Sequence, residues 1–186
     1  MQWLLLGALA VAAAALGLVA GVASRGAAPT RPLSDAERRR LNQLLPRARE
    51  AILNLKSKMA GHGLDFRVCT TMRSASEQAA QVAEGRSAAS VSWHMSGRAA
   101  DLYMIDPRTG AADVKAANRP AYELLHRTAQ ALGFRVLGFR VLQTSGGATF
   151  TDPYHVEWRE GLGGADEALA RYQTGADRSA DGQLYV

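Results

Sequence analysis

The sequence contains few of the residues that cross-link a chain or mark a nucleic-acid surface. Cys69 is its only cysteine, so no disulfide can form within one chain. Because Cys69 follows the apolar residues of a short hydrophobic stretch, we expect a buried structural thiol. No basic stripe interleaved with aromatic residues is present, and nucleic acid is therefore not an expected partner. With 186 residues, the chain is also too short for two independent enzymatic domains.

Charge is absent from residues 3–23, an apolar run long enough to cross a bilayer core of roughly 30 Å as a helix. The run is rich in Ala and Gly, so its hold on a membrane is expected to be weak. No basic residue precedes it and several arginines follow it, which leaves its topology open. The expected divisions are a targeting or anchor segment at 1–23, a linker rich in Pro and small residues at 24–33, and one domain at 34–186.

Basic residues exceed acidic ones by 22 to 17, a net charge of +5 that favours anionic partners such as cell-wall polymers or phospholipid headgroups. Ser34 and Glu37 form a capping box that starts a helix running to Met59, which Pro46 either kinks or divides. Pro120 opens a further helix that Gly133 closes, with His126 on its exposed side.

The remaining pattern predicts short strands and two more helices. The tandem pentapeptide at residues 133–142 indicates either a hairpin or a local duplication. Strands are expected at 64–71, 102–105 and 154–158, and helices at 74–84 and 167–172. This order predicts an α+β domain, with a small central antiparallel sheet and flanking helices, behind an N-terminal hydrophobic helix.

Two segments carry the residues of a metal site. Residues 92–101 (Ser-Trp-His-Met-Ser-Gly-Arg-Ala-Ala-Asp) join His94 to Asp101 across a turn at Gly97, and residues 152–158 supply His155 with a carboxylate on either side. Two neutral imidazoles and one carboxylate make a three-ligand zinc site whose fourth position stays open, as hydrolytic zinc requires. His62 lies in a turn between two glycines, so it and His126 are not expected to be ligands.

These segments resemble a family of zinc enzymes, the D-Ala-D-Ala carboxypeptidases and L-Ala-D-Glu endopeptidases, whose type of fold is shared with hedgehog domains. Residues 92–101 match the pattern Ser-x-His-x-x-Gly-x-Ala-x-Asp, and residues 152–158 match Asp-x-x-His-x-Glu-Trp. Arg73, Ser74 and Gln78 are similar to the Arg-Ser-x-x-x-Gln that follows the first strand of the family.

The resemblance implies one zinc ion held by His94, Asp101 and His155 in a cleft on the sheet. It also implies that Arg73 stabilises the developing oxyanion and that Asp152 is the general base. Glu157 is the competing base, because residues two apart on a strand face the same side. Ser92 and Gln78 are expected to orient substrate or to support the loop.

The function implied is hydrolysis of peptidoglycan stem peptides, with the L-Ala-D-Glu bond as the expected target. The alternatives are a D,D-carboxypeptidase that trims terminal D-Ala and an inactive, zinc-stabilised binding module. We expect a monomer that is exported to the periplasm or cell envelope, initially held at the membrane through residues 3–23. The Ala/Gly-rich run is also similar to the signal-arrest-release segments of phage endolysins, so cleavage, retention and release all remain open.

Overall fold

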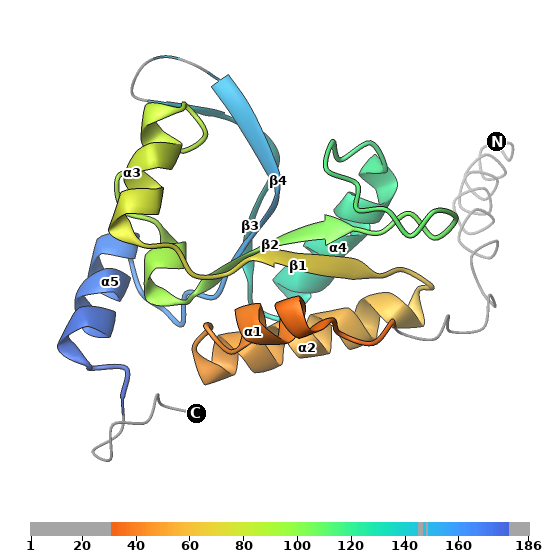
Figure 1. The fold of residues 1–186 in the computed structure, drawn as a ribbon, viewed down its shortest axis with the longest axis horizontal. Helices are drawn as coiled ribbons and strands as arrows, with labels where there is room; N and C mark the ends of the chain where they lie inside the picture. Colours follow the sequence, from red (N-terminus) through yellow and green to blue (C-terminus); the bar gives the residue numbers. More distant parts are fainter. Residues whose placement is uncertain (1–30, 145–146, 148, 179–186) are drawn as a thin grey trace, which may run out of the picture.

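The computed structural model describes residues 31–144, 147 and 149–178 (Figure 1). The predicted hydrophobic helix at residues 3–23 lies outside these residues. Within them, no helix combines the length and the apolar character that crossing a membrane would need.

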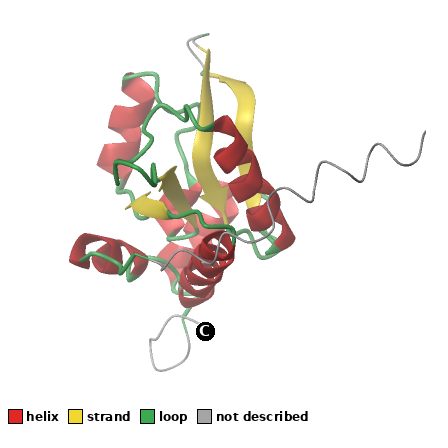
Figure 2. Cartoon of the chain, turned by 90° about the vertical axis from the view of Figure 1, so that its right-hand side faces the viewer, coloured by secondary structure: helices red, strands yellow, loops and turns green. Residues whose placement is uncertain are grey.

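The domain is α+β, as expected, and is built on one four-stranded antiparallel sheet. Its strands lie in the order β1-β2-β4-β3, and β3 and β4 project as a long pair from the body of the fold (Figure 2). The strands are β1 (Phe66–Thr70), β2 (Ala99–Met104), β3 (Arg135–Gln143) and β4 (Thr149–Glu157). The helices are α1 (Asp35–Leu41), α2 (Pro46–Gly61), α3 (Ala75–Ala83), the 3-10 helix η1 (Trp93–Ser96), α4 (Arg119–Ala131) and α5 (Ala165–Thr174).

Pro46 divides the first helical stretch in two. The capping box at the start of α1 is present: the Glu37 amide donates to Ser34 Oγ at 3.3 Å, and the Ser34 amide donates to Glu37 Oε2 at 3.0 Å. α1 ends at Leu41, and Pro46 is the first residue of α2, a position at which a missing backbone N–H costs no helical hydrogen bond. The two helices therefore pack as separate elements.

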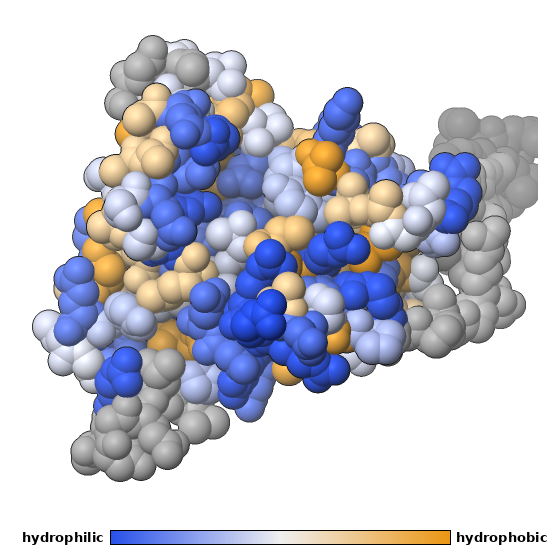
Figure 3. All heavy atoms as spheres, in the orientation of Figure 1, coloured by the Kyte–Doolittle hydropathy of each residue, from blue (hydrophilic) through white to orange (hydrophobic). Residues whose placement is uncertain are grey.

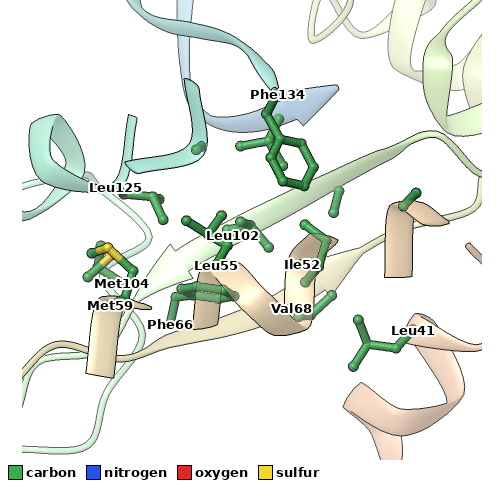
Figure 4. Close-up of a cluster of buried hydrophobic side chains, with 14 of the residues drawn as sticks. Leu41, Ile52, Leu55, Met59, Phe66, Val68, Leu102, Met104, Leu125 and Phe134 are labelled. Carbon is green, nitrogen blue, oxygen red and sulfur yellow. The ribbon is translucent and has the colours of Figure 1, made fainter. Parts of the chain in front are cut away.

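One face of the sheet carries the hydrophobic core. Ile52, Leu55 and Met59 recur at helical spacing on α2 and pack against Phe66 of β1 and Leu102 of β2, as Figure 4 shows. Side chains alternate between the two faces of a strand, so the neighbours of Leu102 point away from this core. The metal-site residue Asp101 thereby lies on the opposite face. On the molecular surface, hydrophilic and apolar side chains are interspersed on the face seen in Figure 3.

Two local expectations were wrong, and one of the two alternatives for the tandem pentapeptide is excluded. Both copies of the tandem pentapeptide lie along β3 or at its start, so they do not form a hairpin with each other. His126 is buried, not exposed, because the α4 face that carries it packs under β3 and β4. Cys69 is half-buried rather than buried; desolvation raises the pKa of its thiol, which disfavours the reactive thiolate.

Candidate metal centre

A tight turn and a strand pair bring the three predicted ligands together. The Ser92 hydroxyl accepts a hydrogen bond from the His94 amide at 3.4 Å and so caps η1; Gly97, the residue after η1, has a φ of 67°. A Cβ atom at Gly97 would lie 2.9 Å from the Gln43 carbonyl oxygen, so only glycine fits here. This turn directs His94 back over β2, where Asp101 is the direct cross-strand partner of His155 on β4.

Three ligand atoms converge on one point. His94 Nε2 lies 3.2 Å from Asp101 Oδ1 and 3.2 Å from His155 Nδ1, and His155 Nδ1 lies 3.3 Å from Asp101 Oδ1. Both histidines are buried, and Asp101 is partly exposed. The predicted set His94, Asp101 and His155 is therefore a candidate metal site in the structure.

The outer hydrogen bonds of the two imidazoles fit a bound metal ion. His94 Nδ1 donates to the Thr71 carbonyl oxygen at 3.1 Å, and His155 Nε2 donates to Glu157 Oε1 at 3.2 Å. Both of these partners only accept hydrogen bonds, so in the neutral rings the lone pairs lie on His94 Nε2 and His155 Nδ1. Those are the two nitrogens that face Asp101 Oδ1. Three lone pairs at this separation repel each other unless a cation joins them.

The carboxylates around His155 make the site favourable for positive charge. Burial by itself raises the pKa of Asp101, but the neighbouring His94 and His155 outweigh it and hold that pKa well below its usual range. Burial likewise lowers the pKa of His155, whereas hydrogen bonds to Asp101 and Glu157 raise it to about 10. The same electrostatics stabilise a proton or a metal cation at this point.

Arg73 lies beside the ligands and is held by Gln78. Its Nη2 lies 3.8 Å from Asp101 Oδ2, and its Nη1 donates to Gln78 Oε1 at 2.8 Å. Gln78 is fully buried, and its amide donates to Ser87 Oγ at 2.9 Å and to the Ala89 carbonyl oxygen at 2.5 Å. Gln78 thus ties the arginine to the loop between α3 and η1. Whether Gln78 or Ser92 also contacts substrate stays a prediction.

The two candidate bases have different surroundings. Glu157 Oε1 accepts from His155, and Glu157 Oε2 accepts from Arg159 Nε at 2.7 Å and pairs with Arg159 Nη2 at 2.6 Å. Burial raises the pKa of Glu157, but these partners outweigh it and lower the pKa. Burial raises the pKa of Asp152, and among the described residues no group donates a hydrogen bond to its carboxylate. Of the two carboxylates, Asp152 is therefore the one that accepts no hydrogen bond from the described residues.

A cleft of about 350 Å³ lies over these residues. Besides the site residues Asp152, His155 and Glu157, the lining residues of β3 and β4 are apolar, and α5 adds two more: Leu137, Leu142 and Phe150, and Ala165 and Asp166. Arg86 and its neighbours in the loop before η1 form another wall. The sequence pattern did not indicate these wall residues or the Thr71 and Arg159 contacts, because they depend on tertiary contacts.

No protein-family model matches the sequence, and no curated protein matches it. Among solved structures, the chain is similar to the L-Ala D-Glu endopeptidase ChiX of Serratia marcescens, with a TM-score of 0.49 and 18% identity, covering 70% of this chain and 91% of that one. It is also similar to VanYB in complex with D-alanine-D-alanine, with a TM-score of 0.44 and 16% identity, covering 71% of this chain and 78% of that one.

Proposed function

We propose that this chain is a zinc-dependent peptidase that cleaves the stem peptide of peptidoglycan, with the L-Ala-D-Glu bond as its target. The observation that carries the proposal is the convergence of the lone pairs of His94 and His155 on Asp101 Oδ1, beside a carboxylate that has no hydrogen-bond donor among the described residues. Two imidazole nitrogens and one carboxylate oxygen are a donor set typical of catalytic zinc. The motifs at residues 92–101 and 152–158 support the same assignment.

Each charged side chain of the site has a distinct task in this proposal. Bound zinc would supply the Lewis acid that polarises the substrate carbonyl and makes a water molecule acidic. Asp152 takes the proton of the attacking water on its carboxylate and passes it to the nitrogen of the leaving amine; its raised pKa suits both transfers. Arg73 places fixed positive charge where the carbonyl oxygen becomes negative. Glu157 holds the His155 ring in the tautomer that leaves Nδ1 free to bind metal.

The chemistry of the cleft suits a short anionic peptide. Arg73 and Arg86 lie on one side, and the apolar residues Leu142 and Phe150 line the wall formed by β3 and β4. The stem peptide offers matching groups, namely free carboxylates and the methyl groups of alanine. Delivery of the domain to this substrate requires export, and we propose that residues 3–23 provide the export signal.

The test is mass spectrometry of purified peptidoglycan after digestion with the zinc-loaded protein. The expected product carries a new N-terminal D-Glu, and a strong chelator abolishes its formation. Loss of terminal D-Ala instead would identify a D,D-carboxypeptidase, and stoichiometric zinc without cleavage would identify a binding module. Full activity in the chelator, with no zinc by elemental analysis, would refute the proposal.

Metal content of point variants provides the matched control. His94→Ala, Asp101→Ala and His155→Ala should each lose zinc, because each removes one of three ligands. His62→Ala should retain it, since His62 is exposed in the turn after α2.

A further inference from the structure

The pairing of β3 and β4 is irregular at the position of Asp152. Val136 pairs with Val156, Gly138 with Asp152, and Val141 with Thr151. From Val136 to Gly138, β3 therefore advances two residues while β4 advances four; from Gly138 to Val141, β3 advances three while β4 advances one. The extra residues of β4 follow Asp152 directly and include Pro153, which has no N–H to donate to a neighbouring strand.

A buried histidine of α4, on the core face of the sheet, contacts both strands at this irregular position. His126 of α4 is only 8% exposed, and its Nε2 donates to the Pro153 carbonyl oxygen at 2.8 Å. The ring lies 5.8 Å from the Phe139 ring, centroid to centroid, and 6.4 Å from that of Tyr122. A side chain from the core thus holds the peptide unit between Pro153 and Tyr154, one residue beyond Asp152.

Gly138 supplies the left-handed backbone conformation that β3 adopts opposite Asp152. It lies opposite Asp152 with φ of 62°, and a Cβ atom there would lie 3.4 Å from His126 Nδ1. Any other residue would adopt a strained backbone here, although its Cβ atom would only reach van der Waals contact with the imidazole. The glycine therefore lets β3 pass over the ring while β4 bulges.

We propose that His126 is a positioning residue for Asp152. This inference rests on the proposed function, in which Asp152 transfers the proton. The β2–β4 ladder ends at Asp101 and His155, so residue 152 lies beyond it and gains no support from β2. The hydrogen bond from His126 to Pro153 fixes the β4 backbone between the base and the ligand His155. Removing that bond lets the Asp152 carboxylate move relative to the metal ligands without disturbing those ligands.

The test compares variants of the zinc-loaded protein. His126→Phe keeps a ring between Phe139 and Tyr122 but removes the donor, His126→Asn has a donor too short to reach Pro153, and His126→Gln places an amide donor near the position of Nε2. Tyr122→Phe, one turn before His126 on α4, is the control. It removes the hydrogen bonds that the Tyr122 hydroxyl makes with Met104 and Asp113 but keeps the ring that packs against His126 and Tyr154 of β4.

We expect His126→Phe and His126→Asn to lower kcat about tenfold to a hundredfold, with zinc content unchanged and KM changed by less than about threefold. His126→Gln should restore most of kcat. Tyr122→Phe should lower Tm with kcat changed by less than about threefold. The proposal is overturned if the donor-less variants keep the kcat of the unmodified protein, or if Tyr122→Phe loses as much kcat as they do at an equal loss of Tm.

Crystal structures give a readout that does not depend on activity. In His126→Phe the Asp152 carboxylate should shift relative to His155 Nδ1, whereas in Tyr122→Phe it should stay in place. An unmoved Asp152 carboxylate in His126→Phe contradicts the positioning role even if the protein proves to have no peptidase activity. Absence of peptidase activity in the unmodified protein contradicts the proposed function alone.

Discussion

At the scale of single residues, the site separates two carboxylates that the sequence leaves as competitors for the same role. Asp152 and Glu157 both flank His155, and strand geometry alone favours Glu157. In the structure Glu157 is saturated by His155 and Arg159, whereas Asp152 lies in the cleft without a hydrogen-bond donor among the described residues. In the proposed function, the hydrogen-bond partners of each carboxylate, rather than its spacing from His155, distinguish the base from the residue that supports the ligand.

Substitutions at these two residues should therefore affect different measurements. Asp152→Asn should retain zinc and lose about a hundredfold to ten-thousandfold in kcat, because the base is gone. Glu157→Gln should keep more kcat at saturating zinc but bind zinc about tenfold to a hundredfold more weakly, because the His155 ring loses its charged acceptor. The measurements are steady-state kinetics and zinc competition with a chelator.

Asp166→Asn is the matched control, since Asp166 is an exposed carboxylate that also lines the cleft. It should behave as the unmodified protein in both measurements. If Glu157→Gln is inactive at saturating zinc while Asp152→Asn is not, the two roles must be exchanged.

At the scale of elements, α1 is joined to the sheet through one buried carboxylate. Glu37 caps α1, pairs with Arg31 at 2.7 Å and accepts the Val68 amide of β1 at 3.3 Å. Burial raises the pKa of Glu37, but the bonds to Arg31 and Ser34 outweigh it and lower the pKa to about 2. Ionised Glu37 therefore stabilises the folded state.

The lowered pKa of Glu37 makes the free energy of unfolding depend on pH. The pKa in the folded state lies below the ordinary value of 4.5, so the stabilisation is present above about pH 4.5 and is lost as the pH falls towards about 2. The shift from 4.5 to about 2 corresponds to about 3 kcal/mol of unfolding free energy before solvent screening, and about 2 kcal/mol of it is lost between about pH 7 and about pH 3. The free energy of unfolding, measured with urea, should differ less between about pH 7 and about pH 3 for Glu37→Gln than for the unmodified protein.

Glu50→Gln, which changes an exposed residue of α2, is the control. Its free energy of unfolding should change between the two pH values as much as that of the unmodified protein. An unchanged pH dependence in Glu37→Gln would contradict the role of this carboxylate.

The C-terminal helix is fastened to the metal-site turn by buried charges. Arg98 directly follows Gly97 and is 3% exposed; its guanidinium pairs with Glu160 and donates to Asp177 Oδ1 at 2.9 Å. Ala168 of α5 packs against Trp93 and Ala99. α5 is thus anchored to the segment that carries His94 and Asp101.

Removing Asp177 should release α5. Asp177→Ala removes one of the two carboxylates that pair with the buried Arg98 guanidinium. Removing one partner of a buried ion pair lowers the free energy of unfolding by about 3 kcal/mol or more. Urea unfolding should report the loss, and limited proteolysis should cut near α5 faster than in the unmodified protein. Asp166→Ala, at an exposed position of α5, should show neither effect; equal stability of the two variants would contradict the anchoring role.

At the scale of the whole molecule, the features that the sequence predicted correctly are those determined by residues close together in the chain. The capping box, the start of α4 near Pro120 and the ligand set all follow from short motifs. The features that were missed depend on distant contacts. His126 faces a strand rather than solvent because β4 bulges above it, and the tandem pentapeptide lies in one strand because its partner is β4. Hydrophobic periodicity carries no information about either pairing.

Residues 3–23 form the apolar run that precedes the domain, and they lie outside the described residues. Their length is sufficient to span a bilayer, but their Ala and Gly content makes membrane retention marginal. Expressed at full length in a Gram-negative host, the protein should place residues 34–186 in the periplasm, first in the membrane fraction. If the segment releases, uncleaved protein should later enter the soluble periplasmic fraction.

Replacing Ala12, Ala13, Ala14 and Ala15 with leucine should suppress that soluble form, because each leucine strengthens insertion. Replacing Ala27 and Ala28, in the expected linker, with leucine is the control and should leave the fractions closer to those of the unmodified protein. Fractionation with N-terminal sequencing distinguishes the outcomes. A soluble form that begins near Ser24 means signal cleavage, and a permanently membrane-bound full-length form means an anchor. A domain that stays in the cytoplasm, protected from protease added to the periplasm, would refute export, because the arginines after the run would then have determined its topology.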